Sequence, residues 1–152
     1  MSAPRLAIVH EHPTWQEPLF KALADRGVHF HTYDLKSAAF DLDGEVHTPV
    51  VFNQASPSAS LRGNGHAVSF ALALLEHLEA VGAKVLNGSS AFRLELSKIA
   101  QVRLIRRLGM DYPRTFAFNR AEALRDQDVK LRFPAILKPN QGGSGARMAE
   151  VG

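Results

Sequence analysis

The sequence predicts an α/β protein, built on a parallel sheet with helices on both faces and followed by a smaller α+β part. Two observations indicate this fold class. Up to Gly88, short apolar runs alternate with stretches of helical spacing, which is typical of a parallel sheet covered on both sides. After Gly88, a longer helical stretch leads to a glycine-rich loop between two extended segments.

Four apolar runs in the first part predict the strands of the sheet. Leu6-Ala7-Ile8-Val9 is apolar without interruption, as expected for a strand buried on both faces. Another run starts at Pro49, where a missing N–H is tolerated. The predicted strands are residues 6–9, 28–33, 49–52 and 84–86.

Two helices are predicted between these strands. Residues 15–26 end before Gly27 and residues 66–81 end before Gly82, and glycine is the preferred residue after a helix. Residues 36–47 carry acidic and small side chains and predict an irregular connection. The helical side chains expected to face inward are Leu19, Ala22, Leu23, Ala67, Ala71, Leu74, Leu75 and Leu78.

This order of elements, joined by right-handed crossovers, is Rossmann-like. In such sheets, ligands bind beyond the carboxyl ends of the strands. Polar residues follow three of the predicted strands and so converge at that edge, although turn chemistry alone also favours polar residues there. They are His10, Glu11, His12, Asn53, Gln54, Asn87 and Gly88.

The second part predicts a long helix over residues 94–108, ended by Gly109. The further predicted elements are a strand at 114–118, a helix at 120–125, a strand at 133–138 and a returning strand at 147–151. That last strand has barely begun where the sequence stops, and a lone hairpin is a poor end for a domain. We therefore expect two domains, residues 1–92 and 93–152, with the second one incomplete.

The glycine-rich loop at residues 140–145 is the first candidate binding element. Gly142, Gly143 and Gly145 allow positive φ and a close approach to a ligand, and successive N–H groups in such a loop can cradle a phosphate. Lys138 ends the preceding strand and could reach that phosphate. The loop lacks the spacing of a P-loop or a dinucleotide fingerprint. The competing interpretation is a flexible hairpin tip with a lysine that protects a sheet edge.

Lys98 is the second candidate. On a helical wheel it shares a face with apolar side chains, and a lysine in such a stripe usually has a partner or a ligand. The alternative is a snorkelling side chain or an ion pair, for example with Glu95. The apolar neighbours on the wheel are Leu94, Val102, Ile105 and Leu108.

Polar residues between the third strand and the second helix form the third candidate group, with Ser56 and Ser58 among them. Arg62 could bind a substrate carboxylate. Asn64 or Ser60 could instead cap the helix that follows.

Composition excludes several classes of protein. The chain has 152 residues, is 45% apolar and carries a formal charge of +3, with no block of like charges that would indicate a nucleic-acid-binding arm. Cysteine is absent, which excludes disulfides and Cys-based zinc sites and fits a cytoplasmic protein. We see no signal peptide or membrane span. The histidine pairs 10/12 and 29/31 each share a strand face, but no carboxylate cluster completes a metal site.

Six segments, in their order and spacing, resemble RimK-like ATP-grasp ligases, the group related to glutathione synthetase. The resemblance covers nearly two-thirds of the chain. The resembling segments are residues 53–58, 74–79, 82–88, 95–98, 109–115 and 133–139, with the glycine loop next.

This resemblance implies a pre-ATP-grasp α/β domain followed by the start of an ATP-grasp domain. It implies a ligase that activates a carboxylate as an acylphosphate, which an amine attacks to form an amide, with ATP and Mg²⁺. The lysines and the loop match residues that contact the nucleotide: Lys98, Lys138, Gln141, Gly142, Gly143, Ser144 and Gly145. We assign substrate binding to Asn53, Ser56, Ser58 and Arg62.

The chain also departs from the family pattern. The family's magnesium ligands lie downstream of the glycine loop and are missing, and Gln54 stands where relatives often have arginine. We therefore assign no metal ligand or catalytic residue, and we expect the chain alone to be inactive. Its expected partners are small-molecule or peptide carboxylates and amines, and a homo-oligomer is possible. The alternatives are a non-catalytic partner-binding or dimerisation module and a Rossmann-like nucleotide or sugar-phosphate binder unrelated to ligases.

Overall fold

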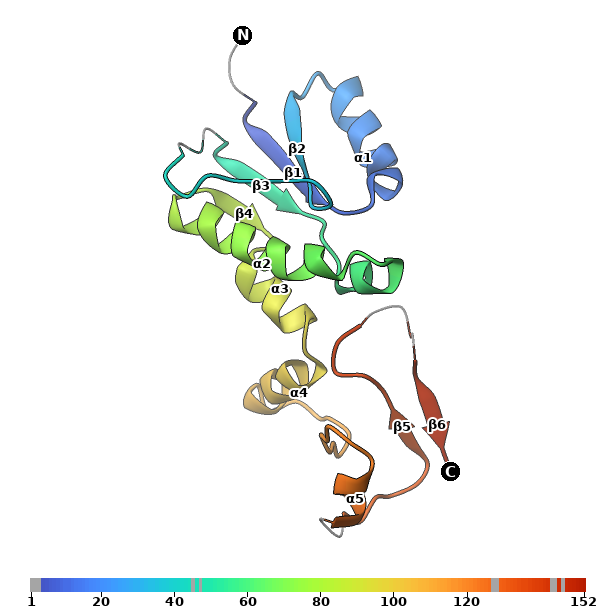
Figure 1. The fold of residues 1–152 in the computed structure, drawn as a ribbon. Helices are drawn as coiled ribbons and strands as arrows, with labels where there is room; N and C mark the ends of the chain where they lie inside the picture. The colour runs from blue at the N-terminus through green and yellow to red at the C-terminus, as the bar shows by residue number, and fades with distance from the viewer. Residues whose placement is uncertain (1–3, 45, 47, 127–128, 143–144, 146) are drawn as a thin grey trace. The chain divides into compact units, whose positions relative to one another are not determined.

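The computed structural model describes residues 4–44, 46, 48–126, 129–142, 145 and 147–152. It divides into two compact units, Met1–Arg93 and Leu94–Gly152. Figure 1 shows the elements of both units along the chain. Among the described helices, none is long and apolar enough to cross a membrane.

The first unit contains the predicted parallel sheet. Its strands are β1 (Leu6–His10), β2 (Phe30–Asp34), β3 (Val50–Asn53) and β4 (Lys84–Leu86), in the order β2-β1-β3-β4. All neighbouring strands are parallel. The apolar runs predicted these strands to within a few residues, and the mixed α/β fold class is confirmed.

Both faces of the central strand are covered. Ala7, Ile8 and Val9 point to alternate faces of β1, and all three are completely buried. On one face, Phe20 of α1 (Pro13–Asp25) stacks on Phe30 of β2 with ring centroids 5.2 Å apart. This double burial is why the sequence of β1 shows no alternation of apolar and polar residues.

The helix α2 (Gly65–Ala80) supplies most of the remaining core. The five residues of its predicted stripe are all buried. Gly27 and Gly82, predicted to end α1 and α2, have φ values of 64° and 91°, which glycine adopts without steric cost. The short 3₁₀-helix η1 (Pro57–Arg62) precedes α2, and α3 (Ser89–Glu95) follows β4.

The second unit is built from α4 (Lys98–Arg107), α5 (Glu122–Asp126) and an antiparallel pair, β5 (Ala135–Leu137) with β6 (Ala149–Val151). The predicted returning strand and the short helix before it are confirmed. Among the described residues of 94–152, none is buried.

Two predictions in this part of the chain were wrong. Residues 94–108 do not form one helix, because Ser97 adopts an extended conformation between α3 and α4 and its Oγ accepts a hydrogen bond from Ala100 N (3.1 Å). A helix start, rather than a helix interior, is what serine favours. The predicted strand at 114–118 is absent, since no described strand pairs with that segment.

Candidate functional site

The direction in which strands are added reverses at one point in the first unit's sheet. Successive connections lead from β1 to β2 on one side and then back to β3 on the other side. Such a reversal separates the two crossovers and leaves a crevice beyond the adjoining strand ends. Glu11 directly follows β1 and Asn53 ends β3, so both residues flank this point.

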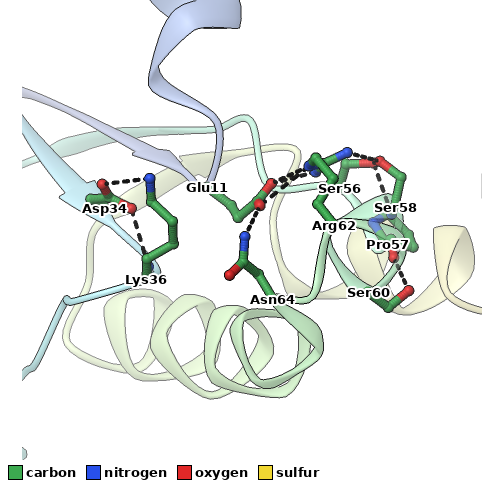
Figure 2. Close-up of polar contacts among 9 residues, drawn as sticks. All are labelled: Glu11, Asp34, Lys36, Ser56, Pro57, Ser58, Ser60, Arg62 and Asn64. Atoms are coloured by element: carbon green, nitrogen blue, oxygen red, sulfur yellow. Dashed lines mark hydrogen bonds and ion pairs between the residues drawn. The ribbon is translucent and has the colours of Figure 1, made fainter.

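Glu11 is the centre of a hydrogen-bonded cluster at this edge (Figure 2). Its carboxylate is buried and accepts hydrogen bonds from the Arg62 guanidinium, with Nε 3.1 Å from Oε2, and from Asn64 Nδ2 at 2.6 Å. Arg62 also donates from Nη1 to Ser58 Oγ at 3.0 Å. The Arg62 guanidinium lies over the Trp15 ring, 4.6 Å from its centroid. We call Glu11, Ser58, Arg62 and Asn64 the Glu11 cluster.

The electrostatics of this edge keep Glu11 charged and His10 neutral at neutral pH. Hydrogen bonds from Arg62 lower the pKa of Glu11, and they outweigh the opposing effect of burial. Burial lowers the pKa of His10, and the nearby Asp34 offsets this only in part. The imidazole of His10 packs edge-on against Phe20, and its buried Nδ1 has no hydrogen-bond partner.

A pair of asparagines joins the ends of β3 and β4. Asn53 donates from Nδ2 to the Asn87 carbonyl at 2.9 Å, and Asn87 donates from Nδ2 to the Asn53 carbonyl at 3.3 Å. Asn53 Oδ1 also accepts a hydrogen bond from Ala55 N. Asn87 has φ 55°, a left-handed conformation that asparagine tolerates better than most residues. The side chain of Asn53 is therefore occupied within the protein.

The structure also decides the capping alternatives for the residues before α2. Asn64 occupies the N-cap position of α2, but its side chain binds Glu11 instead of the helix N–H groups. Ser60 Oγ donates to the carbonyl of Pro57. Ser56 caps the preceding η1, since its Oγ accepts a hydrogen bond from Ser58 N. Neither of the two residues suggested as caps of α2 caps that helix.

In the second unit, the first residue of the glycine loop binds the start of α4. Asn140 Oδ1 accepts hydrogen bonds from Ile99 N at 3.0 Å and from Ser97 Oγ at 3.2 Å. The main-chain oxygen of Asn140 accepts a hydrogen bond from Lys98 N, also at 3.0 Å. One asparagine thus holds three donors that lie more than 40 residues earlier in the chain.

Lys98 reaches the glycine loop itself. Its Nζ donates to the main-chain oxygen of Gly142 at 3.1 Å. The helical-wheel argument for Lys98 was wrong, because Lys98 is the first residue of α4 and Leu94 belongs to α3. Partial desolvation raises the pKa of Glu95, and the charge of Lys98 partly opposes this.

The remaining residues predicted to contact the nucleotide are Lys138 and those of the loop from Gln141 to Gly145. Lys138 and Gln141 are exposed. Gly142 and Gly145 have φ values of 137° and 68°, in the region that favours glycine. Gly143 and Ser144 lie outside the described residues.

Metal binding can be assessed for the part of the chain that the structure describes. There, no group of three or more His, Asp or Glu side chains is placed to hold a metal ion. Within those residues there is therefore no donor set to which Mg²⁺ could be assigned.

Three residues of these sites have roles that were not predicted from the sequence. The role of Asn64 could not be seen from sequence, and Glu11 was noted only as a polar residue at a strand end. The polar contacts of Asn140 were also missed, although the residue stood at the start of the glycine loop. Each of these side chains acts through partners more than 40 residues away, which local patterns do not record.

The chain was compared with known proteins. No protein-family model matches it, and no curated protein matches it in sequence. Among solved structures, it is similar to a RimK-domain ATP-grasp protein from Sphaerobacter thermophilus, with a TM-score of 0.69 and 19% identity over 97% of this chain and 53% of that one.

It is also similar to the ATP-grasp ligase PsnB. In a complex of PsnB with a minimal precursor, Mg and ADP, the TM-score is 0.61 and the identity 20%, over 100% of this chain and 59% of PsnB. In a complex of PsnB with a precursor peptide and AMPPNP, the values are 0.60 and 21%, over 98% and 58%. The chain thus spans little more than half the length of these proteins, and its fold is that of RimK-like ATP-grasp proteins over that length.

Proposed function

We propose that this chain carries part of an ATP-dependent carboxylate–amine ligase. In the reaction, a carboxylate oxygen attacks the γ-phosphorus of ATP and ADP leaves. An amine then attacks the acyl carbon, phosphate leaves, and the nitrogen loses a proton. The observation that carries the proposal is the contact of Lys98 Nζ with Gly142 O, which brings a cation onto a glycine-rich loop in a chain with the ATP-grasp fold.

In this proposal, residues of the second unit bind the phosphates of ATP. Lys98 and Lys138 would donate to phosphate oxygens, and the N–H groups of residues 141–145 would add further donors. Residues 94–152 contain 11 Lys and Arg against 6 Asp and Glu, whereas residues 1–93 contain 7 against 9. The cationic surplus of the second unit favours a polyanion such as ATP.

Magnesium would neutralise phosphate charge when it accompanies the nucleotide. The described residues provide no metal-ligand set. We therefore assign no residue of this chain to Mg²⁺ and derive no step from it.

The Glu11 cluster and Ser56 would form a wall of the substrate site in the first unit. Arg62 has five N–H donors, of which Glu11 and Ser58 use those on Nε and one on each Nη atom. A substrate carboxylate would bind the two that remain. Asn53 would act by shaping the strand end, since its side chain is already bonded to Asn87. Because PsnB is solved with a precursor peptide, we propose a peptide as the source of a reacting group.

The test is calorimetric titration of ATP, with and without Mg²⁺, into the chain and into any longer product of a reading frame that continues past Gly152. Lys98→Ala should weaken ATP binding at least about tenfold, the effect of losing a charge-assisted hydrogen bond. Arg103→Ala is the matched control, because it removes an exposed charge from the same helix without touching the loop. It should change affinity less than about twofold.

Two results would contradict the proposal. One is equal weakening by both substitutions, which would show that only net charge matters. The other is the absence of nucleotide binding by every product. A partner-binding or dimerisation module would then be the better interpretation, and self-association measured by sedimentation would support it.

A further inference from the structure

The start of α4 has a complete set of hydrogen-bond acceptors, and Asn140 supplies most of it. The first four N–H groups at the start of a helix have no partner within that helix, and here the one on the N-cap residue Ser97 donates to Leu94 O. Here Lys98 N donates to Asn140 O, Ile99 N donates to Asn140 Oδ1, and Ala100 N donates to Ser97 Oγ. The Ser97 hydroxyl donates in turn to Asn140 Oδ1. The helix terminus is therefore occupied by the protein and leaves no N–H free for a phosphate.

The same contacts connect the two parts of the proposed phosphate site. Asn140 stands two residues before Gly142, and Lys98 is the first residue of α4. Two hydrogen bonds therefore fix the position of the loop entrance relative to Lys98. One joins Lys98 N to the main-chain oxygen of Asn140, and the other joins Ile99 N to its side-chain oxygen. Lys98 Nζ then lies 3.1 Å from Gly142 O. Among the described residues, this unit has no buried side chain that could set that position instead.

We infer that Asn140 is a positioning residue, whose side-chain oxygen holds the entrance of the glycine loop against the start of α4 and thereby places Lys98 at the loop. The effect of Asn140 on nucleotide binding rests on the proposed function. Its effect on the position of the loop does not. An acceptor oxygen at this side chain is the required feature. Among the described residues, the Asn140 side-chain amide nitrogen donates no hydrogen bond.

The first experiment measures amide hydrogen exchange by NMR in the whole chain, residue by residue. In Asn140→Ala, the amide of Ile99 loses its acceptor directly. The informative amide is that of Lys98, whose acceptor is a main-chain oxygen that alanine retains. If the side chain positions the loop, the Lys98 amide should exchange about tenfold faster, as expected for loss of a stabilising contact of ordinary strength.

Two further variants make this result decisive. Asn140→Asp keeps the acceptor oxygen and should keep the Lys98 amide protected, even if Asn140→Ala loosens the whole of α4. Ser97→Ala is the matched control, since it removes the cap of α4 and one donor to Asn140 Oδ1 but leaves the hydrogen bonds from Ile99 N and Lys98 N to Asn140 in place. It should speed exchange at Ala100 far more than at Lys98. Unchanged protection of Lys98 in Asn140→Ala, or loss of it in Asn140→Asp, would overturn the inference.

The second experiment is ATP titration of the Asn140→Ala variant, in whichever product binds the nucleotide. Affinity should fall about tenfold, because Lys98 and the loop are no longer held together. Unchanged affinity would refute the link to nucleotide binding. If the unsubstituted protein itself does not bind ATP, the proposed function fails, and the exchange measurements still decide whether Asn140 positions the loop.

Discussion

The two units of this chain are stabilised in different ways. The buried apolar side chains among the described residues all lie in the first unit, which contains the four-stranded sheet. In the part of the second unit that the structure describes, just two short strands are paired, and apolar side chains such as Ile136 and Phe133 are exposed. Its defined local geometry comes from polar contacts instead, with Asn140 at their centre. Apolar burial therefore stabilises the fold of the first unit, whereas hydrogen bonds fix the geometry of the proposed phosphate site in the second.

Removing buried volume should give the largest difference between the units. Leu75 is completely buried in α2, so Leu75→Ala should lower the free energy of unfolding by about 2–5 kcal/mol. Ile136 is 63% exposed, and Ile136→Ala should cost less than about 0.5 kcal/mol. Urea unfolding followed by circular dichroism measures both. Similar losses would show that the second unit has a core of equal importance.

Breaking the Glu11 cluster should have the next largest effect. Glu11→Ala leaves the Arg62 guanidinium without its carboxylate at a buried edge, and about 3 kcal/mol of stability should be lost. The control is Glu76→Ala, which breaks an ion pair with Arg93 whose side chains are 41% and 59% exposed. Such a pair contributes at most about 1 kcal/mol. Equal effects in urea unfolding would mean that the Glu11 cluster is ordinary surface charge.

Acidification should destabilise the first unit in two steps. Burial lowers the pKa values of His10 and His31 in the folded chain, so below about pH 6.5 the unfolded chain binds protons that the folded chain does not. Stability is therefore constant above that pH and falls below it. The lowered pKa of Glu11 adds a second loss as the pH falls from about 4.5 through its folded pKa.

The measurement is the free energy of unfolding in urea between pH 7.5 and pH 5, a range that spans the ordinary histidine pKa of 6.5. His10→Phe keeps a ring against Phe20 and should flatten the loss below pH 6.5, while the exposed His66→Gln serves as the control. A pH dependence that is the same in His10→Phe as in the parent chain would refute this assignment. This effect should be the smallest of the three.

The difference between apolar burial in the first unit and polar contacts in the second also explains which elements the sequence predicted. The strands and helices of the first unit were predicted because burial leaves apolar runs and stripes, such as Leu6 to Val9 and the face of α2. The second unit was predicted less well. Helical spacing ran past Ser97, and no pattern revealed that its hydroxyl starts a new helix.

The candidate sites show the same limit. The polar strand ends and the glycine loop stood out by residue type. The partners that define them, Glu11 with Arg62 and Asn140 with Ile99, are brought together only by the fold. The sequence singled out Lys98 by its place on the wheel of a single long helix. In the structure Lys98 instead starts α4, because the helix is interrupted at Ser97.

The strand order β2-β1-β3-β4 has a consequence for how the chain folds as the ribosome makes it. β1 emerges first and becomes the template for the sheet. β2 then adds to one of its edges, β3 to the other, and β4 to β3, so each new strand meets a partner that has already been synthesised. No strand must wait for a later one or insert between two that are already paired. A sheet of this kind can therefore grow in the order of translation, and the aggregation-prone edges left open at each stage are few.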